Sequence, residues 1–372
     1  MRIIVDIAHP AHVHFFKNFI WEMEKRGHEV IITAGDKEVT LKLLDNYGFK
    51  YHFTCKRTTG YRLMFEIVKR DFQMLKFVKK YNPDIVMGIA STISAHVSRV
   101  TSAKSIVFTD NFLNYDKILT HPWADTIITP TSFTHDLGKK QIKVPTFKEL
   151  AYLHPNRFDP NSNIYNLMNL KETDRYAIVR FVSFKAFHDT NKSGFNDKDK
   201  IRLVNAIKKY ANVIISCEGE LPEELKQYEM KFPPERIHDA LYFADLLVTD
   251  SQTMTTEAAV LGTPAIRCNN WVDSGNEMLN FIELEKKYNL IHNFSNSDIA
   301  ISKCCNILGN PDLKKEYRER NKKMLFDKID FTEFLMWLSE NHFKYHGKEM
   351  QNSYIDYRSE CLDIHKLSRC SE

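Results

Sequence analysis

The sequence has little glycine, no strong net charge and no long apolar run, and each shortage argues against a class of protein. Only 12 of its 372 residues are glycine. A phosphate site built on glycine-rich turns is therefore not indicated, because such turns need residues without Cβ. The net charge of +4 does not by itself argue for nucleic acid, and we expect no such partner. No apolar run approaches the ~20 residues that a membrane-spanning helix needs.

The seven cysteines lack the spacing of metal ligands and are typical of reduced, buried thiols in a cytosolic protein. The chain enters a predicted strand at its first residues, so no signal peptide is expected. We therefore expect a cytoplasmic protein.

A chain of 372 residues suits two domains better than one core. The first half repeats short apolar runs, most of them followed by helical segments, which predicts a doubly wound α/β domain over residues 1–155. Its strands are expected at 2–7, 29–33, 49–54, 84–89, 105–108 and 124–129, and we take the last of these as the final strand of this half.

The turn after the first strand is rich in histidine: Ala8-His9-Pro10-Ala11-His12-Val13-His14. It lies at the carboxyl end of a strand, where such sheets bind ligands. His12 and His14 are two apart at a helix start and point to different sides, which counts against a metal site. The remaining interpretations are a histidine that acts on a ligand and a histidine satisfied by local hydrogen bonds.

Two other features of the first half have two interpretations each. Asp110 and Asn111 lie at the end of a predicted strand. They are either ligand-binding residues or ordinary turn residues. The basic loop 56–62 leads into a helix over 63–80 with one apolar face and many lysines. That helix either packs on the core with a solvated basic face or touches an anionic membrane surface.

The second half begins after a linker at His154–Asn161, which contains two prolines. Residues 165–330 repeat the doubly wound pattern, residues 331–345 form a helix that is expected to cross back to the first domain, and 346–372 form a polar tail. Strand-end turns carry Lys185, His188 and Glu218, and His238 lies close before the next expected strand.

The segment 244–268, ADLLVTDSQTMTTEAAVLGTPAIRC, is the most informative part of the chain. It predicts a strand, a loop, a helix that ends at a positive-φ Gly262, and a second strand. The loop therefore opens a helix whose free N–H groups face the ligand-binding edge, a place suited to an anion.

Glu257 lies one turn inside that helix. A capping-box role would need Ser or Thr three residues earlier, and that position is Met254. The carboxylate either accepts hydrogen bonds from a sugar diol next to a bound phosphate or simply complements the helix dipole.

Five phrases together resemble a family of unknown function, found in archaea and bacteria, that is grouped with GT-B proteins. They are DIAHPAHVHFFKNFI, RGHEVIITA, DLGKKQI, KELAYLHPNRF and DSQTMTTEAAVLGTPAIR. The GT-B fold consists of two doubly wound Rossmann-like domains that face each other across a cleft. Nucleotide-sugar glycosyltransferases and UDP-N-acetylglucosamine 2-epimerases share it, so the resemblance implies a nucleotide-sugar ligand.

The resemblance also implies roles for individual residues. By similarity to a transferase that adds N-acetylglucosamine to a lipid-linked precursor, Ser251, Thr253, Thr255 and Glu257 hold the nucleotide sugar, with Glu257 on the ribose. His238 lies in the region that frames the base. His12 corresponds in place to a first-domain histidine, with His9 beside it. Lys185 and His188 would meet phosphate as charges where the family's relatives have glycine.

The sequence leaves three hypotheses open. The first is a metal-independent glycosyltransferase without a cofactor, which uses a UDP-linked or similar sugar in polysaccharide or glycolipid synthesis, with His12 as general base. Its acceptor would be a polysaccharide or a lipid-linked molecule, which would place the protein at the inner face of the membrane. The second is a sugar-nucleotide epimerase, whose acid and base groups would come from Asp110, His12, His188 and Glu218. The third is a non-catalytic nucleotide-sugar binder.

Overall fold

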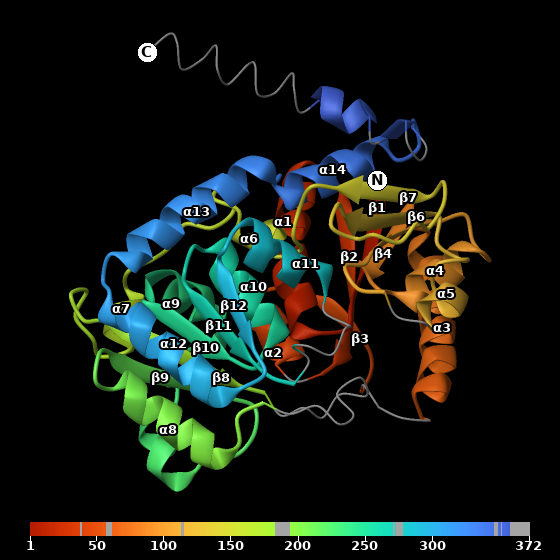
Figure 1. Ribbon diagram of the computed structural model, residues 1–372. Coiled ribbons are helices and arrows are strands. Elements are labelled where there is room, and N and C mark those ends of the chain that lie inside the picture. The colour runs from red at the N-terminus through yellow and green to blue at the C-terminus, as the bar shows by residue number, and fades with distance from the viewer. Residues whose placement is uncertain are drawn as a thin grey trace. The chain divides into compact units, whose positions relative to one another are not determined.

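The computed structural model describes residues 1–37, 39–56, 62–112, 115–182, 194–270, 272, 278–345, 349–350 and 352–357. The chain divides into two compact units (Figure 1). Unit 1 comprises Met1–Tyr152 and Ile329–Glu372, and unit 2 comprises Leu153–Lys328.

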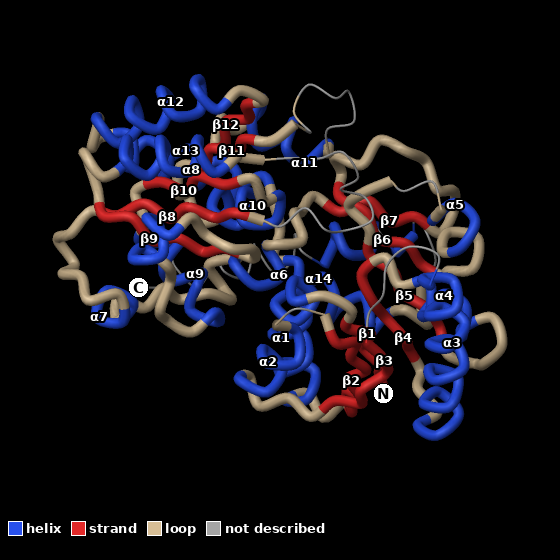
Figure 2. The backbone as a smooth tube through the Cα atoms, turned by 90° about the horizontal axis from the view of Figure 1, so that it is seen from below, coloured by secondary structure: helices blue, strands red, loops and turns tan. Residues whose placement is uncertain are grey.

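Unit 1 contains a seven-stranded parallel sheet of order β3-β2-β1-β4-β5-β6-β7 (Figure 2). Its strands are β1 Arg2–Ile7, β2 Glu29–Asp36, β3 Tyr51–Lys56, β4 Ile85–Ile89, β5 Lys104–Phe108, β6 Thr126–Pro130 and β7 Gln141–Val144. The strand order reverses between β1 and β4, as in doubly wound sheets. The expectation that the strand near residue 129 is the last of this half is wrong, because Gln141–Val144 pairs in parallel with β6.

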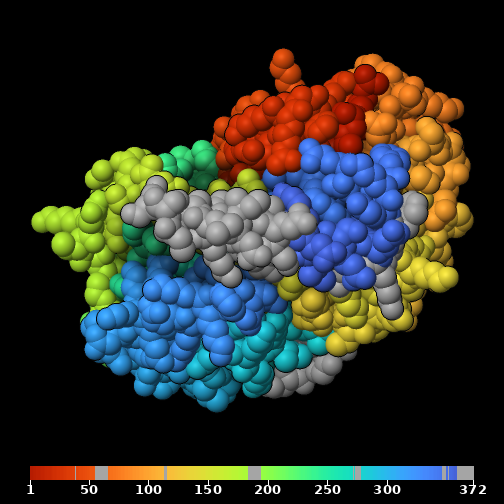
Figure 3. Space-filling view, turned by 90° about the horizontal axis from the view of Figure 1, so that it is seen from above, coloured from red at the N-terminus to blue at the C-terminus, as the bar shows by residue number. Residues whose placement is uncertain are grey.

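The helices of unit 1 are α1 Pro10–Lys25, α2 Thr40–Asn46, α3 Arg62–Tyr81, α4 Thr92–Ser98, α5 Asp116–Leu119, α6 Leu150–Leu153 and α14 Phe331–Asn341, with the end of α6 at the unit boundary. One face of the sheet packs on α3 and α4 through Ile4, Met74, Val86 and Ile93. On the other face α1 and α14 meet at aromatic contacts, since the Phe15 ring lies 5.3 Å from that of Phe331. Figure 3 shows this C-terminal part of unit 1 against the N-terminal residues.

Unit 2 contains a five-stranded parallel sheet of order β12-β11-β10-β8-β9. Its strands are β8 Tyr176–Phe181, β9 Asn212–Cys217, β10 Leu246–Thr249, β11 Ala265–Cys268 and β12 Ile291–Phe294. Its α-helices are α7 Ile164–Leu167, α8 Asp197–Ile207, α9 Ile237–Phe243, α10 Gln252–Val260, α11 Leu279–Ile282, α12 Ser297–Gly309 and α13 Leu313–Asp327. Two 3-10 turns, Glu223–Tyr228 and Pro234–Arg236, and a π-helical turn, Glu283–Lys287, complete it.

The core of unit 2 lies between its sheet and the helices α8 and α12. Buried aliphatic residues of the strands, such as Val179, Val248 and Ile266, pack there against Leu203 and Ile307. These strands are short apolar runs covered on both sides by helices, which is the pattern of a parallel sheet. As a result, all polar groups at the carboxyl ends of β8 to β11 reach one edge of the sheet.

Candidate functional site

The N-terminus of α10 opens at the carboxyl edge of the unit 2 sheet. Its N-cap, Ser251, has extended backbone (φ −78°, ψ 142°), and its side chain makes no capping hydrogen bond to the residues that the structure describes. The first turn contains no acidic residue. The first N–H groups of a helix have no partner within it, so the positive end of α10 faces this edge.

The other end of α10 is held by α13. The Asn321 side-chain amide donates to the carbonyl oxygens of Ala259 and Val260, at 3.0 and 2.7 Å. The Arg318 guanidinium donates to the carbonyl of Leu261. A cation at a helix C-terminus complements the helix dipole. Helix α13 therefore holds α10 at the end far from the carboxyl edge of the sheet.

Gly262 ends α10 with φ +73°, as the sequence predicts. A Cβ at this position would lie 3.1 Å from Cδ of Arg318 and 3.1 Å from Cβ of Asn321. The glycine is therefore needed both for its backbone conformation and for the close packing of α13.

Glu257 and His238 form a buried pair. Glu257 lies on α10 and His238 on α9, 19 residues earlier, and Nε2 of the histidine lies 3.0 Å from Oε1 of the glutamate. Both side chains are buried. The structure thus brings together two residues that the sequence proposes separately, and the histidine orients the carboxylate.

The hydroxyl groups of the same loop differ in their surroundings. Thr255 is buried and donates its hydroxyl hydrogen to the carbonyl of Ser251 at 2.7 Å, so that hydrogen is used inside the helix. Ser251 and Thr253 are half-buried at the helix start. Lys185 and His188 lie outside the described residues.

Glu218 follows β9 and pairs with Arg180 of β8, which sequence reasoning missed. Arg180 also donates to Oγ of Ser216 at 2.6 Å. Beside them lies Asp250, whose pKa burial raises to about 7. A charged residue such as Arg180 inside an apolar strand is a signal that the sequence offers for this group.

In unit 1 the two proposed histidines lie at the start of α1, with ring centroids 5.9 Å apart. Nδ1 of His9 accepts the Ala11 N–H at 3.1 Å, and Nδ1 of His12 accepts the Ala8 N–H at 3.3 Å. A neutral ring whose Nδ1 accepts a hydrogen bond holds its proton on Nε2. Both rings can therefore donate from Nε2.

Asp110 lies after β5, as expected, and its Oδ2 accepts from Lys148 at 2.9 Å. Lys148 also lies 3.6 Å from the buried Glu149. The carboxylate of Asp110 is thus held in an ion pair.

A buried polar network that the sequence analysis missed lies at the carboxyl end of β1. Asp6 accepts from Arg70 of α3 through both oxygens, each at 3.0 Å, and from Ser91 at 2.8 Å. Thr33 donates to Oδ1 of Asp6 at 3.2 Å. This network joins β1 and β2 to α3 and α4 at the point where the strand order reverses.

Asp116, the first residue of α5, is another buried carboxyl of unit 1. Its Oδ1 accepts from Thr120 at 2.9 Å, and Thr120 also contacts the Thr92 hydroxyl at 2.8 Å. Its Oδ2 has no hydrogen-bond partner among the described residues. Burial raises the pKa of this carboxyl to about 6.

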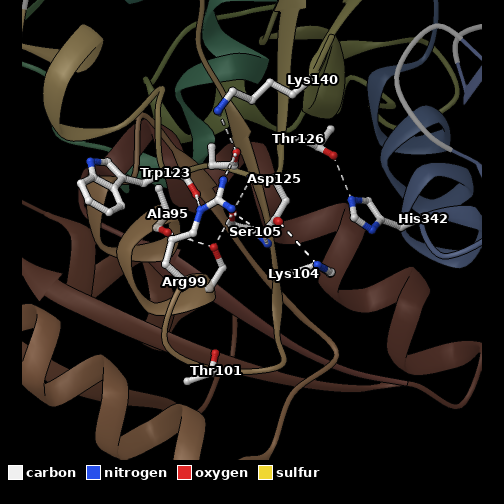
Figure 4. A network of polar contacts seen from close by, with 12 residues as sticks. Ala95, Arg99, Thr101, Lys104, Ser105, Trp123, Asp125, Thr126, Lys140 and His342 are labelled. Atoms are coloured by element: carbon white, nitrogen blue, oxygen red, sulfur yellow. Dashed lines mark hydrogen bonds and ion pairs between the residues drawn. The ribbon is translucent and has the colours of Figure 1, made fainter.

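A further network lies at the amino end of the same sheet and has a structural role (Figure 4). Arg99 donates to the carbonyls of Trp123 and Ala124, and Asp125 accepts from the N–H and hydroxyl of Ser105. These hydrogen bonds lower the pKa of Asp125 against the effect of its burial. The network holds the loop before β6.

In the part of the chain that the structure describes, no group of three or more His, Cys, Asp or Glu side chains could hold a metal ion. Within the same residues, no helix is long and apolar enough to cross a membrane.

Comparison with known proteins identifies the family and the fold. The family model described as "Protein of unknown function (DUF354)" matches residues 1–300. An uncharacterized protein of Methanocaldococcus jannaschii is 21% identical over 343 residues, which cover 83% of this chain and 99% of the relative. The resemblance noted in the sequence is therefore confirmed.

Two solved structures show the fold. The UDP-GlcNAc 2-epimerase of Neisseria meningitidis, bound to UDP-GlcNAc, matches with a TM-score of 0.62 at 11% identity and covers 93% of this chain and 100% of that chain. The Streptomyces sp. SF2575 glycosyltransferase SsfS6, complexed with thymidine diphosphate, matches with a TM-score of 0.57 at 15% identity and covers 90% and 99%. With two parallel sheets in Rossmann-like units, this chain has the predicted GT-B fold class.

Proposed function

This chain belongs to the DUF354 family of proteins of unknown function, and from its site we propose that it is a glycosyltransferase that uses a nucleoside-diphosphate sugar. The products we expect are cell-surface polysaccharides or glycolipids. One observation carries the proposal: the Ser251 side chain at the N-terminus of α10 caps no N–H group of the described residues, while Asn321 and Arg318 hold the other end of the helix. Helix N-termini bind phosphate groups through free N–H groups and the dipole.

Each residue of this edge has a proposed role. The N–H groups of the first turn of α10 bind the diphosphate, together with the hydroxyls of Ser251 and Thr253. Glu257 accepts hydrogen bonds from the ribose diol, and His238 orients it from 3.0 Å. The helix dipole stabilises the leaving diphosphate, so we propose that the reaction needs no bound metal.

Unit 1 contributes the proposed catalytic residues His12 and Asp110. In the tautomer that the Ala8 N–H selects, His12 donates a hydrogen bond from Nε2 to a substrate oxygen. To act as a general base through Nε2, His12 needs the other neutral tautomer, with its proton on Nδ1. His12→Asn retains a donor and removes the base, so near-normal turnover in this variant would refute the base role, and turnover as low as in His12→Ala would support it.

The central test combines binding with product analysis. We expect UDP-GlcNAc or a dTDP-sugar to bind the purified protein, as measured by calorimetry. Glu257→Gln should weaken binding about tenfold or more, because hydrogen bonds to a charged group contribute about 1.5–3 kcal/mol. Glu224→Gln, an exposed change in the same unit, should have no effect.

Mass spectrometry of the reaction then separates the activities. Free nucleotide plus a glycoside supports the transferase. An epimer of the sugar nucleotide would instead show an epimerase, and an unchanged bound ligand would show a binder. Absence of binding to every common nucleotide sugar would overturn the proposal.

The exposed side of α3 supports a second proposal, peripheral contact with an anionic membrane that carries a lipid-linked acceptor. Val68 and Phe72 lie one turn apart and are 49% and 65% exposed. The exposed lysines around them are Lys69, Lys76, Lys79 and Lys80. Apolar side chains flanked by lysines suit the surface of anionic lipids.

Vesicle flotation tests this surface. The protein should float with vesicles of phosphatidylserine and phosphatidylcholine and much less with phosphatidylcholine alone. Phe72→Glu should abolish flotation, while Phe326→Glu, a change at an even more exposed phenylalanine on α13, should not. Equal flotation of Phe72→Glu and the unchanged protein would contradict the membrane role.

A further inference from the structure

A buried carboxyl group lies directly before the proposed diphosphate site. Asp250 follows β10 and precedes Ser251, the N-cap of α10. The residue is 3% exposed. Its Oδ1 accepts the Val182 N–H at 2.8 Å, and its backbone carbonyl accepts from the Asn269 amide at 3.0 Å. The carboxyl is therefore fixed at the edge of the sheet between the ends of β8 and β11.

Gly194 packs against the same carboxyl. A Cβ at position 194 would lie 2.2 Å from Oδ2 of Asp250 and 2.7 Å from its Cγ. No room exists for a side chain there, so the carboxyl is closely covered. A covered carboxyl is poorly solvated, and poor solvation disfavours its ionised form.

The charges that face Asp250 come from three neighbouring strands. Arg180 of β8 lowers its pKa, and Glu218, which follows β9, raises it. The nearby thiols are Cys217 of β9 and Cys268 of β11, and Asp250 in turn raises the pKa of each. Behind the thiols, α8 contributes Lys200 near Cys217 and Asp199 near Cys268.

We propose that Asp250 couples nucleotide-sugar binding to pH, because the ligand binds when this carboxyl is protonated and the ionised carboxylate opposes it. The inference rests on the proposed diphosphate site at α10. A bound diphosphate adds negative charge beside a covered carboxylate, and two like charges in a poorly solvated place cannot both be accommodated well. Ligand binding therefore takes up a proton at Asp250.

The expected change in the dissociation constant follows from the pH at which Asp250 ionises. Burial raises the pKa of Asp250 to about 7. A ligand that binds the protonated form alone then has a dissociation constant that rises about tenfold between pH 6 and pH 8. At pH 7 about half of the molecules are ionised, so each binding event takes up about half a proton.

Calorimetry with UDP-GlcNAc tests the proposal, because both phosphates of this probe are esterified and its charge stays constant in this range. We expect Kd to rise about tenfold from pH 6 to pH 8 in the unchanged protein. Asp250→Asn keeps an acceptor for Val182 and cannot ionise, so its Kd should be the same at both pH values. Titrations in buffers of different ionisation enthalpy should show the proton uptake in the unchanged protein and none in Asp250→Asn.

Asp245→Asn is the matched control, because Asp245 lies at the other end of the same strand, paired with Arg175 and Lys314. This variant should keep the full pH dependence of binding. Glu218→Gln removes the negative charge that raises the pKa of Asp250, so it should move the midpoint to lower pH. If Asp250→Asn does not fold, the shift of the pH midpoint in Glu218→Gln still tests the role of Asp250.

Two failures can be told apart. Binding of UDP-GlcNAc with a Kd independent of pH, or a pH dependence that persists in Asp250→Asn, would overturn the role of Asp250 alone. If no variant binds UDP-GlcNAc or dTDP-glucose at any pH, the proposed diphosphate site itself fails.

Discussion

Replacing Asp116 by asparagine should change how the stability of this protein depends on pH. Asp116 is 1% exposed, and burial raises the pKa of its carboxyl to about 6 from an ordinary 3.8. Between these values the folded protein keeps a proton that the unfolded chain has released. The stability that this proton provides is complete below pH 3.8 and is lost as pH rises through about 6.

The magnitude follows from the difference of about two pH units. Each unit corresponds to about 1.4 kcal/mol, so the full effect is about 3 kcal/mol, of which the unchanged protein loses about 2.4 kcal/mol relative to Asp116→Asn between pH 4 and pH 7. Asparagine still accepts from Thr120 through its side-chain oxygen. Its amide takes the place of Oδ2, which has no partner among the described residues, and this adds a cost that is the same at every pH.

The assay is urea unfolding followed by far-ultraviolet circular dichroism at several pH values from 4 to 7.5. The difference in unfolding free energy between the two proteins should change steadily toward neutral pH, in favour of Asp116→Asn. Asp125→Asn is the control at the opposite edge of the same sheet. The pKa of Asp125 is lowered. The difference in unfolding free energy between the unchanged protein and Asp125→Asn should therefore not vary with pH above pH 5. A difference for Asp116→Asn that does not vary with pH would refute the reasoning.

Three further changes have expected outcomes. Asn321→Ala removes two hydrogen bonds to the end of α10 and should cost about 1–3 kcal/mol in urea unfolding, whereas an unchanged midpoint would mean that α13 does not hold the helix. Gly262→Ala should lower the thermal midpoint more than Gly138→Ala, because both have positive φ but only Gly262 lacks room for Cβ; equal losses would exclude crowding. A hydrogen bond to Asp71 raises the pKa of His96. The unchanged protein should therefore gain stability over His96→Gln as pH falls from 8 to 6. A gain in stability as pH rises would contradict this.

The sheets could be predicted where strands are buried on both faces. Strands such as Arg2–Ile7 and Ala265–Cys268 are apolar runs with clear boundaries, and the structure places them as predicted. The four-residue strands Gln141–Val144 and Ile291–Phe294 contain polar residues and lie at sheet edges. They become strands because they pair with β6 and β11, and this pairing is not visible in local sequence.

The candidate site could likewise be predicted only where its residues are neighbours in the sequence. The helix and its glycine stop are readable, because strand, loop, helix and Gly262 follow one another in the chain, although the sequence predicts the helix over 254–261 and it spans Gln252–Val260. That His238 meets Glu257 depends on the packing of α9 against α10, which no spacing reveals. The grouping of Arg180 with Asp250 was missed because it forms only where the strands align their ends, although a charged residue inside an apolar strand marks Arg180 in the sequence.

The way α10 is held has a consequence for how this family can change. Asn321 and Arg318 of α13 donate hydrogen bonds to carbonyl oxygens at the far end of α10. At its open end, the side chain of Ser251 makes no capping hydrogen bond to the described residues, and Thr253 is half-buried. If the proposed diphosphate site is right, substitutions of these two side chains can alter ligand preference while α13 still holds the far end of the helix. One scaffold can diversify its specificity in this way, and an engineer can randomise those positions without rebuilding the fold.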